Sequence, residues 1–125
     1  MVKKQATTAA KLPKSTFVKT IIDAMQELKG VDITVLDLRK IQEASADYFI
    51  ICHGTSSTHI SGIVDRIQKN VWESLGERPF HAEGRQGRHW LLLDYFTVVV
   101  HVFDREKRDF YDIEHLWSDA VVLKF

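Results

Sequence analysis

The sequence predicts a single α/β domain with a mixed sheet of about five strands flanked by helices. Two amphipathic helical patterns, at residues 15–29 and 57–75, flank two apolar strand segments. Further strand-forming segments lie between residues 78 and 103, and a last helical pattern follows them. In the order α-β-β-α-β-β-β-α, the long crossover helix favours a parallel strand pair and the hairpin favours an antiparallel one.

The N-terminal elements begin and end at recognisable residues. Ser15 is placed to cap the first helix, whose apolar side chains form one stripe, and Gly30 ends it. Residues 32–38 alternate as a strand does. Residues 46–53 are more continuously apolar, as expected for a central strand.

The long helix follows the turn "GTSST". Ser57 or Thr58 is placed to cap it, and its apolar residues keep helical spacing until Gly76. A short strand is predicted within residues 78–84, opening after Pro79, and a polar Gly-containing loop follows it.

The last third of the chain predicts a hairpin and a short helix. The hairpin is "HWLLLDYFTVVVHVF", residues 89–103, with a break at Tyr95-Phe96. The helix, "REKRDFYDIEHLW", would cover one edge of the sheet with Phe110, Ile113, Leu116 and Trp117 at helical spacing. The tail "SDAVVLKF" is assigned no role.

The hairpin has one aliphatic face and one mixed face. If Asp94 faces Thr97 across the turn, Trp90 opposes His101, because side chains alternate along a strand. The aliphatic face suits the core. The other face has apolar bulk with a few polar groups, as in interface hot spots: Trp90, Leu92, Asp94, Thr97, Val99, His101 and Phe103.

Two interpretations of the mixed face remain open. It is either a docking surface for another protein, or a face that the terminal helix covers. In the second case Trp90 would pack on Phe110, and His101 would bond to Asp94 or to backbone. Sheet faces in α/β proteins are usually covered.

Composition indicates a soluble, cytoplasmic protein. The chain has 125 residues and 45% hydrophobic content, and its N-terminus lacks the apolar segment of a secretory signal. No apolar stretch approaches the length of a membrane-spanning helix. The single cysteine, Cys52, excludes an intrachain disulfide and is expected to be a buried free thiol.

Charge is unevenly distributed although the net charge is zero. Residues 1–14 contain four of the 17 basic residues and no acid, so residues 15–125 carry a net charge of about −4. We expect the first segment to be a disordered basic leader. An acidic body favours a protein partner, in particular a basic one, over nucleic acid, which is held through clustered Lys and Arg.

Catalytic and metal chemistry find little support. "HGTSSTH" offers a turn before a helix N-terminus that could hold a phosphate, but Gly54 as turn and Ser57 as cap explain it without a ligand. There is no Asp-x-Asp to hold Mg²⁺. The six histidines include no helical i,i+4 pair, which disfavours zinc. Cys52 and His53 point to opposite faces of a strand, so they form no catalytic pair.

Several motifs in order resemble the ribosomal silencing factor family, also called Iojap or RsfS. They are "DYFIICHGTSSTHISGIVDRI", "EG" at 83–84, "WLLLDY", "VVVHVF" and "R…FYDIEHLW", and the resemblance spans about residues 16–118. It assigns residues 15–125 to a silencing factor domain. The fold it implies is similar to nucleotidyltransferases, without their catalytic residues.

The resemblance also implies a function and a contact surface. Family members are translational repressors of starvation or stationary phase. They bind the large ribosomal subunit through its fourteenth ribosomal protein and sterically block the small subunit. They are not enzymes and use no cofactor. Carried to this chain, the contact residues are Glu83, Trp90, Leu92, Asp94, His101 and Tyr111.

Two further expectations follow. Where the family commonly has Gly-Asp after "DY", this chain has Phe96-Thr97, so we expect either a wider loop or a packed Phe96. An exposed row centred on Trp90 also favours a homodimer when the protein is free. A minimal nucleotide-binding enzyme and an RNA-binding assembly factor remain the alternatives.

Overall fold

The fold is described by a computed structural model for residues 16–84, 87 and 89–125. The basic leader predicted at residues 1–14 and the cap predicted at Ser15 lie outside this range. The elements in chain order are α2 (Thr16–Glu27), β1 (Val31–Asp37), β2 (Tyr48–Gly54), α3 (Ser57–Leu75), β3 (His81–Glu83), β4 (Trp90–Asp94), β5 (Val98–Asp104), α4 (Arg105–Tyr111), α5 (Ile113–Leu116) and β6 (Val121–Lys124).

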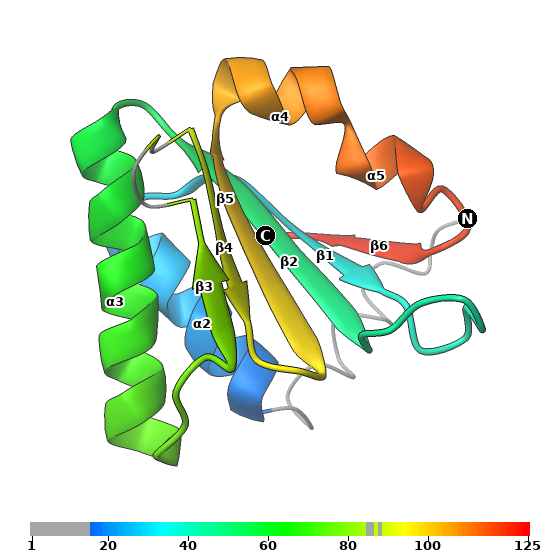
Figure 1. Ribbon diagram of the computed structural model, residues 1–125, viewed down its shortest axis with the longest axis horizontal. Helices are drawn as coiled ribbons and strands as arrows, with labels where there is room; N and C mark the ends of the chain where they lie inside the picture. Colours follow the sequence, from blue (N-terminus) through cyan, green and yellow to red (C-terminus); the bar gives the residue numbers. More distant parts are fainter. Residues whose placement is uncertain (1–15, 85–86, 88) are drawn as a thin grey trace.

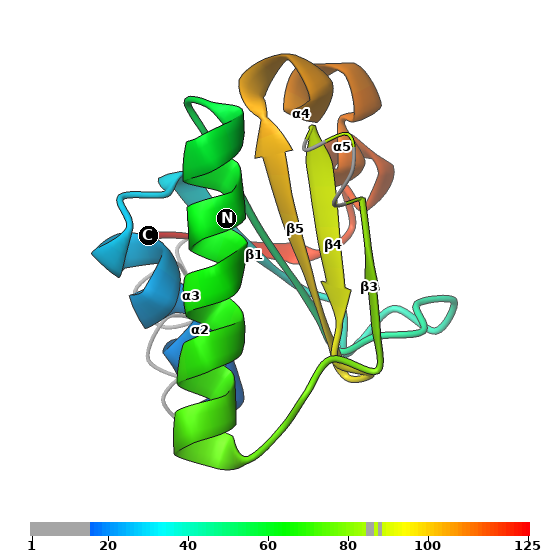
Figure 2. The ribbon, with the colours of Figure 1, turned by 60° about the vertical axis from the view of Figure 1, so that its left-hand side comes forward.

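The predicted α/β architecture with a mixed sheet is confirmed. The strand order is β3-β4-β5-β2-β1-β6, in which β2 and β5 run parallel and the other neighbours run antiparallel. Helices α2 and α3 cover one face of the sheet, and α4 and α5 lie over part of the opposite face (Figures 1 and 2). The sixth strand, β6, comes from the tail that the sequence analysis left unassigned.

The larger apolar core lies between the sheet and the α2–α3 layer. Ile21, Met25, Ile63 and Ile67 are fully buried there against the aliphatic face of the sheet. Cys52 is a buried free thiol, as predicted, and burial raises its pKa to about 12. None of the helices in the described part of the chain is long and apolar enough to cross a membrane.

Helix α3 starts at a different cap from the one predicted. Its N-cap is Ser56, whose Oγ accepts the N–H of His59 at 3.0 Å, and not Ser57 or Thr58. The predicted stop is correct, because Gly76 has the left-handed φ of +67° that ends a helix.

The hairpin register predicted from the sequence is wrong by two residues. Trp90 pairs with Phe103 and Leu92 with His101, because the tight loop is Phe96-Thr97 and Tyr95 still belongs to the ladder. The Tyr95 N–H donates to the carbonyl of Val98 at 2.8 Å, and its buried ring packs edge-on against Phe17. A shift of two preserves parity, so the division into two faces holds.

The turn itself is tight, and the wider loop expected at Phe96 is not found. Phe96 has a φ of +84°, which is costly for an aromatic residue, and its N–H donates to Asp94 Oδ1 at 2.8 Å. Its ring stays 74% exposed and lies 6.0 Å from that of Phe80, so it is not packed in the core.

The single terminal helix predicted from the sequence is two helices. Asp112 has a φ of +46°, which ends α4 and begins α5. Ile113 is buried and Trp117 packs partly against the sheet, as predicted. Phe110 and Leu116 are 76% and 74% exposed, so their assignment to the packed side was wrong.

Gly84→Ala is expected to disrupt the β3–β4 pairing. Gly84 has a φ of +91°, and a Cβ there would lie 2.0 Å from the carbonyl oxygen of Trp90. We expect a loss of at least about 2 kcal/mol in the free energy of unfolding, measured by urea denaturation. The control is Gly62→Ala in α3, where the Cβ would meet only Leu28 Cδ1 at 3.7 Å. Equal stability of the two variants would contradict the steric argument.

Candidate protein-docking site

The residues predicted as a contact surface come together on one face of the sheet. Directly paired residues share a face, and the β3–β4–β5 register pairs Glu83 with Leu92 and Leu92 with His101. Trp90 and Asp94 each lie two residues from Leu92 along β4, so all three side chains point to the same face. The sixth residue, Tyr111, reaches this face from helix α4. We call the surface formed by these six residues the docking face.

An aromatic cluster occupies the end of the face that lies next to helix α4. The indole of Trp90 lies between Phe103, at 5.0 Å between ring centroids, and Tyr111, at 4.6 Å. The stacked arrangement with Phe103 and the tilted one with Tyr111 are favourable for aromatic pairs. Tyr111, and not the Phe110 considered from the sequence, therefore packs on Trp90.

The face is only partly covered by its own chain. Trp90, Leu92, Asp94 and Val99 are all half-buried, and Tyr111 is 43% exposed. Helix α4 lies over the end where β5 leads into it (Figure 2), whereas Ile113 and Trp117 pack farther along the sheet, toward β1 and the start of β2. A row that starts at Trp90 and continues to Asp94 therefore remains partly open to solvent.

His101 is the buried polar residue of the face. Its Nδ1 accepts the indole N–H of Trp90 at 3.1 Å, and not a bond from Asp94 or backbone as considered from the sequence. Nδ1 is thus unprotonated, which places the proton of the neutral ring on Nε2. Nε2 is buried without a hydrogen-bond partner among the described residues. Burial lowers the pKa of His101 to about 4.

Two acidic side chains lie at the border of the face, Glu83 on the edge strand β3 and Asp94 at the turn end of β4. Glu83 is exposed and forms an ion pair with His81 of the same strand. Asp94 lies opposite His81 in the adjacent strand. The apolar row thus has acidic groups at its rim, where a basic partner would meet them.

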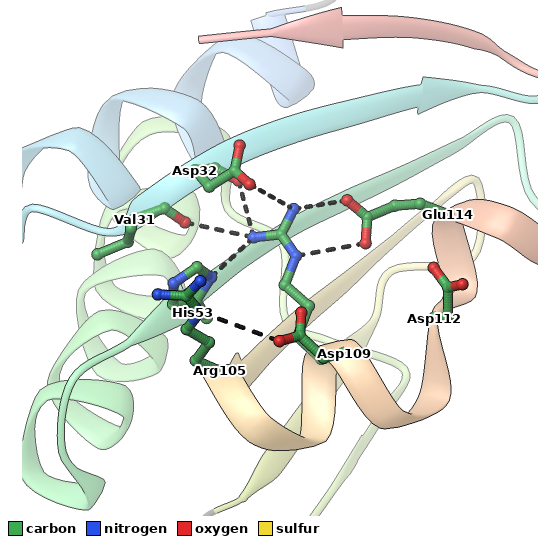
Figure 3. Close-up of a pocket in the computed structure, with 8 residues that line it drawn as sticks. Val31, Asp32, His53, Arg105, Asp109, Asp112 and Glu114 are labelled. Atoms are coloured by element: carbon green, nitrogen blue, oxygen red, sulfur yellow. Dashed lines mark hydrogen bonds and ion pairs between the residues drawn. The ribbon is translucent and has the colours of Figure 1, made fainter.

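A polar pocket of about 460 Å³ lies beside the docking face, between α4 and the ends of β1 and β2 (Figure 3). At its centre Arg108, only 5% exposed, holds Glu114 with two bonds, of 2.7 Å to Oε2 and 3.3 Å to Oε1. It also donates to the carbonyl of Asp32 at 2.8 Å and to His53 Nδ1 at 3.0 Å. Sequence reasoning did not single out Arg108.

The turn before α3 is occupied by the protein's own groups. The Thr55 N–H donates to His59 Nδ1 at 2.9 Å, and His59 Nε2 bonds to the carbonyl of Leu28 at 2.6 Å. Gly54 is needed because a Cβ there would lie 2.8 Å from Ile60 Cγ1. These contacts explain the "GTSS" sequence as a packed turn, which was the simpler of the two interpretations.

The comparisons with known proteins agree with the motifs. A family model described as "Ribosomal silencing factor during starvation" matches residues 11–124. The chain belongs to the ribosomal silencing factor family. The resemblance inferred from the motifs is therefore confirmed.

Individual silencing factors cover most of the chain. The Bacillus subtilis ribosomal silencing factor RsfS is 36% identical over 107 residues, which are 86% of this chain and 89% of that protein. A crystal structure of a Chromobacterium violaceum protein superposes with a TM-score of 0.77 at 33% identity and covers 82% of this chain and 83% of that one.

A more distant relative is known from an organelle. The mouse "Mitochondrial assembly of ribosomal large subunit protein 1" is 29% identical over 101 residues, which are 78% of this chain and 43% of that protein.

His101 should make the stability of this protein depend on pH. The unfolded ring takes up a proton near its ordinary pKa of 6.5, whereas the folded ring does so only near 4. The folded state is therefore progressively destabilised as the pH falls from 6.5 to 4, by about 3 kcal/mol in total from this group. Urea denaturation across this range measures the slope.

His101→Gln should flatten that dependence, because glutamine does not titrate. His115→Gln is the matched control, since His115 is an exposed histidine on the short helix α5. Parallel pH profiles for wild type and His101→Gln would show that another group is responsible.

Proposed function

We propose that this protein is a non-enzymatic translational repressor that binds the large ribosomal subunit. Its docking face, centred on Trp90, would contact the fourteenth large-subunit ribosomal protein at the subunit-joining face. The bound protein then sterically blocks association with the small subunit. The cytoplasm, during starvation or stationary phase, is the setting in which this activity would operate.

Three observations support the proposal. Membership of the ribosomal silencing factor family connects the chain to ribosomes. Trp90 and Leu92 are half-buried side chains held in place by the sheet, and their residue types are typical of protein interfaces. This observation carries the proposal. The net charge of about −4 on residues 15–125 complements a basic ribosomal protein and disfavours direct binding of RNA.

The free protein would protect the same row by forming a homodimer. A two-fold dimer buries one patch against its own copy, so the partner and the second copy would compete for Trp90. The ribosome-bound form is then a monomer.

Assembly of the large subunit is a second candidate function, because the name of the mouse relative refers to it. The two roles separate with purified, mature subunits. A repressor blocks their joining directly, whereas a factor that acts only in assembly leaves joining unchanged.

Trp90→Ala should weaken binding to the large subunit by about 30-fold or more, because central aromatic residues typically contribute about 2 kcal/mol or more to an interface. Co-sedimentation measures the affinity, and light scattering during subunit joining measures the block. Circular dichroism verifies that the variant is folded.

Trp72→Ala is the matched control for this experiment. Trp72 is 48% exposed on α3, which covers the opposite face of the sheet, so its removal should leave binding unchanged. Wild-type binding by a folded Trp90→Ala variant would remove the hairpin from the mechanism.

A further inference from the structure

Arg108 connects helix α4 to three other segments of the fold. Its guanidinium donates to the backbone of β1 through the carbonyls of Val31 and Asp32, at 3.4 Å and 2.8 Å. It reaches β2 through His53 Nδ1 and α5 through Glu114 (Figure 3). All of these bonds start from one side chain that is almost completely buried.

The guanidinium makes further contacts that use its remaining donor positions. Nη2 donates to Thr34 Oγ1 at 3.1 Å, and Asp32 Oδ2 lies 3.8 Å away as an ion-pair partner. The planar fork of arginine suits this set of acceptors, and a lysine could satisfy only part of it. All three nitrogens of the Arg108 guanidinium therefore have acceptors within the protein, and we call this set of contacts the Arg108 clamp.

Few large apolar side chains hold α4 and α5 to the sheet. Phe110 and Leu116, the large apolar residues of these helices besides Tyr111 and Ile113, are mostly exposed. Ile113 is buried, and Trp117 contacts Phe49 edge-on at 6.0 Å. Ile113 anchors α5 in a smaller apolar core with Leu36 and Ile51, and Arg108 supplies a second, polar anchor for both helices.

The same helix carries Tyr111 to the docking face. Tyr111 follows Arg108 by three residues, a spacing that puts both side chains on neighbouring parts of one helix surface. Arg108 points to β1 and β2, while the ring of Tyr111 lies 4.6 Å from Trp90. The position of the clamp therefore sets where Tyr111 meets the indole.

We infer that Arg108 is a positioning residue for ribosome binding: its contacts with Asp32, His53 and Glu114 hold α4 so that Tyr111 and Trp90 form one preorganised contact surface. The inference rests on the proposed function. It assigns Arg108 no contact with the partner, because the side chain is buried in the free protein.

Arg108→Met removes all the polar contacts of the clamp at similar side-chain length. We expect large-subunit binding at least about tenfold weaker, with faster hydrogen exchange in residues 105–117 and unchanged exchange in α2 and α3. Arg108→Lys keeps the charge with fewer bonds and should rescue binding in part. If the substitution lowered only the overall stability, hydrogen exchange would not speed up in residues 105–117 alone, and Arg108→Lys would not restore part of the binding.

Arg105→Met is the matched control. Arg105 lies on the same helix, its side chain is 80% exposed, and its ion pair with Asp109 is 3.9 Å long. It should bind and exchange as the wild type does.

Wild-type affinity in a folded Arg108→Met variant would overturn the inference. If Arg108→Met does not fold, Arg108→Lys and Glu114→Gln take its place. For either variant, faster hydrogen exchange in α4 together with wild-type affinity for large subunits would overturn the inference. If the wild-type protein does not bind large subunits, the proposed function fails. Unchanged exchange of residues 105–117 in Arg108→Met would separately refute the clamp in the free protein.

Discussion

The parallel pairing of β2 with β5 is the constraint on which the rest of the molecule depends. It aligns Ile51 with His101 and His53 with Phe103, so one register fixes both the docking face and the floor of the Arg108 pocket. Helix α4 starts directly at the end of β5, where the carboxylate of Asp104 accepts the N–H of Lys107 at 2.7 Å. The helix therefore leaves the sheet next to His53, and its side chains reach both sites.

Periodicity and parity were sufficient to predict most of the fold. The apolar stripes of α2 and α3 and the continuous apolar residues of β2 are local signals, and they placed these elements correctly. The hairpin register was not predictable in the same way, because the turn places Phe96 at a φ of +84° without the glycine or asparagine that usually marks such a position. Strand β6 was missed because its four residues form a strand only against the edge of β1.

The candidate site was predictable where its residues share a strand face and unpredictable where they meet through backbone. Trp90, Leu92 and Asp94 alternate in sequence, so their common face follows from geometry alone. Arg108 binds main-chain carbonyls more than 70 residues away, one of them at Asp32, which has a left-handed φ of +53°. No local pattern encodes such a contact. The break at Asp112 similarly hid the pairing of Arg108 with Glu114.

The hairpin turn gives Asp94 two simultaneous duties. One carboxylate oxygen holds the N–H of Phe96, which keeps an aromatic residue in a backbone conformation normally left to glycine. Among the described residues, the other oxygen accepts no hydrogen bond, so it can meet a cation. Asp94→Ala would therefore remove the bond that shapes the loop together with the charge, whereas Asp94→Asn keeps an oxygen for the Phe96 N–H and removes the charge alone, so the two variants separate the two contributions.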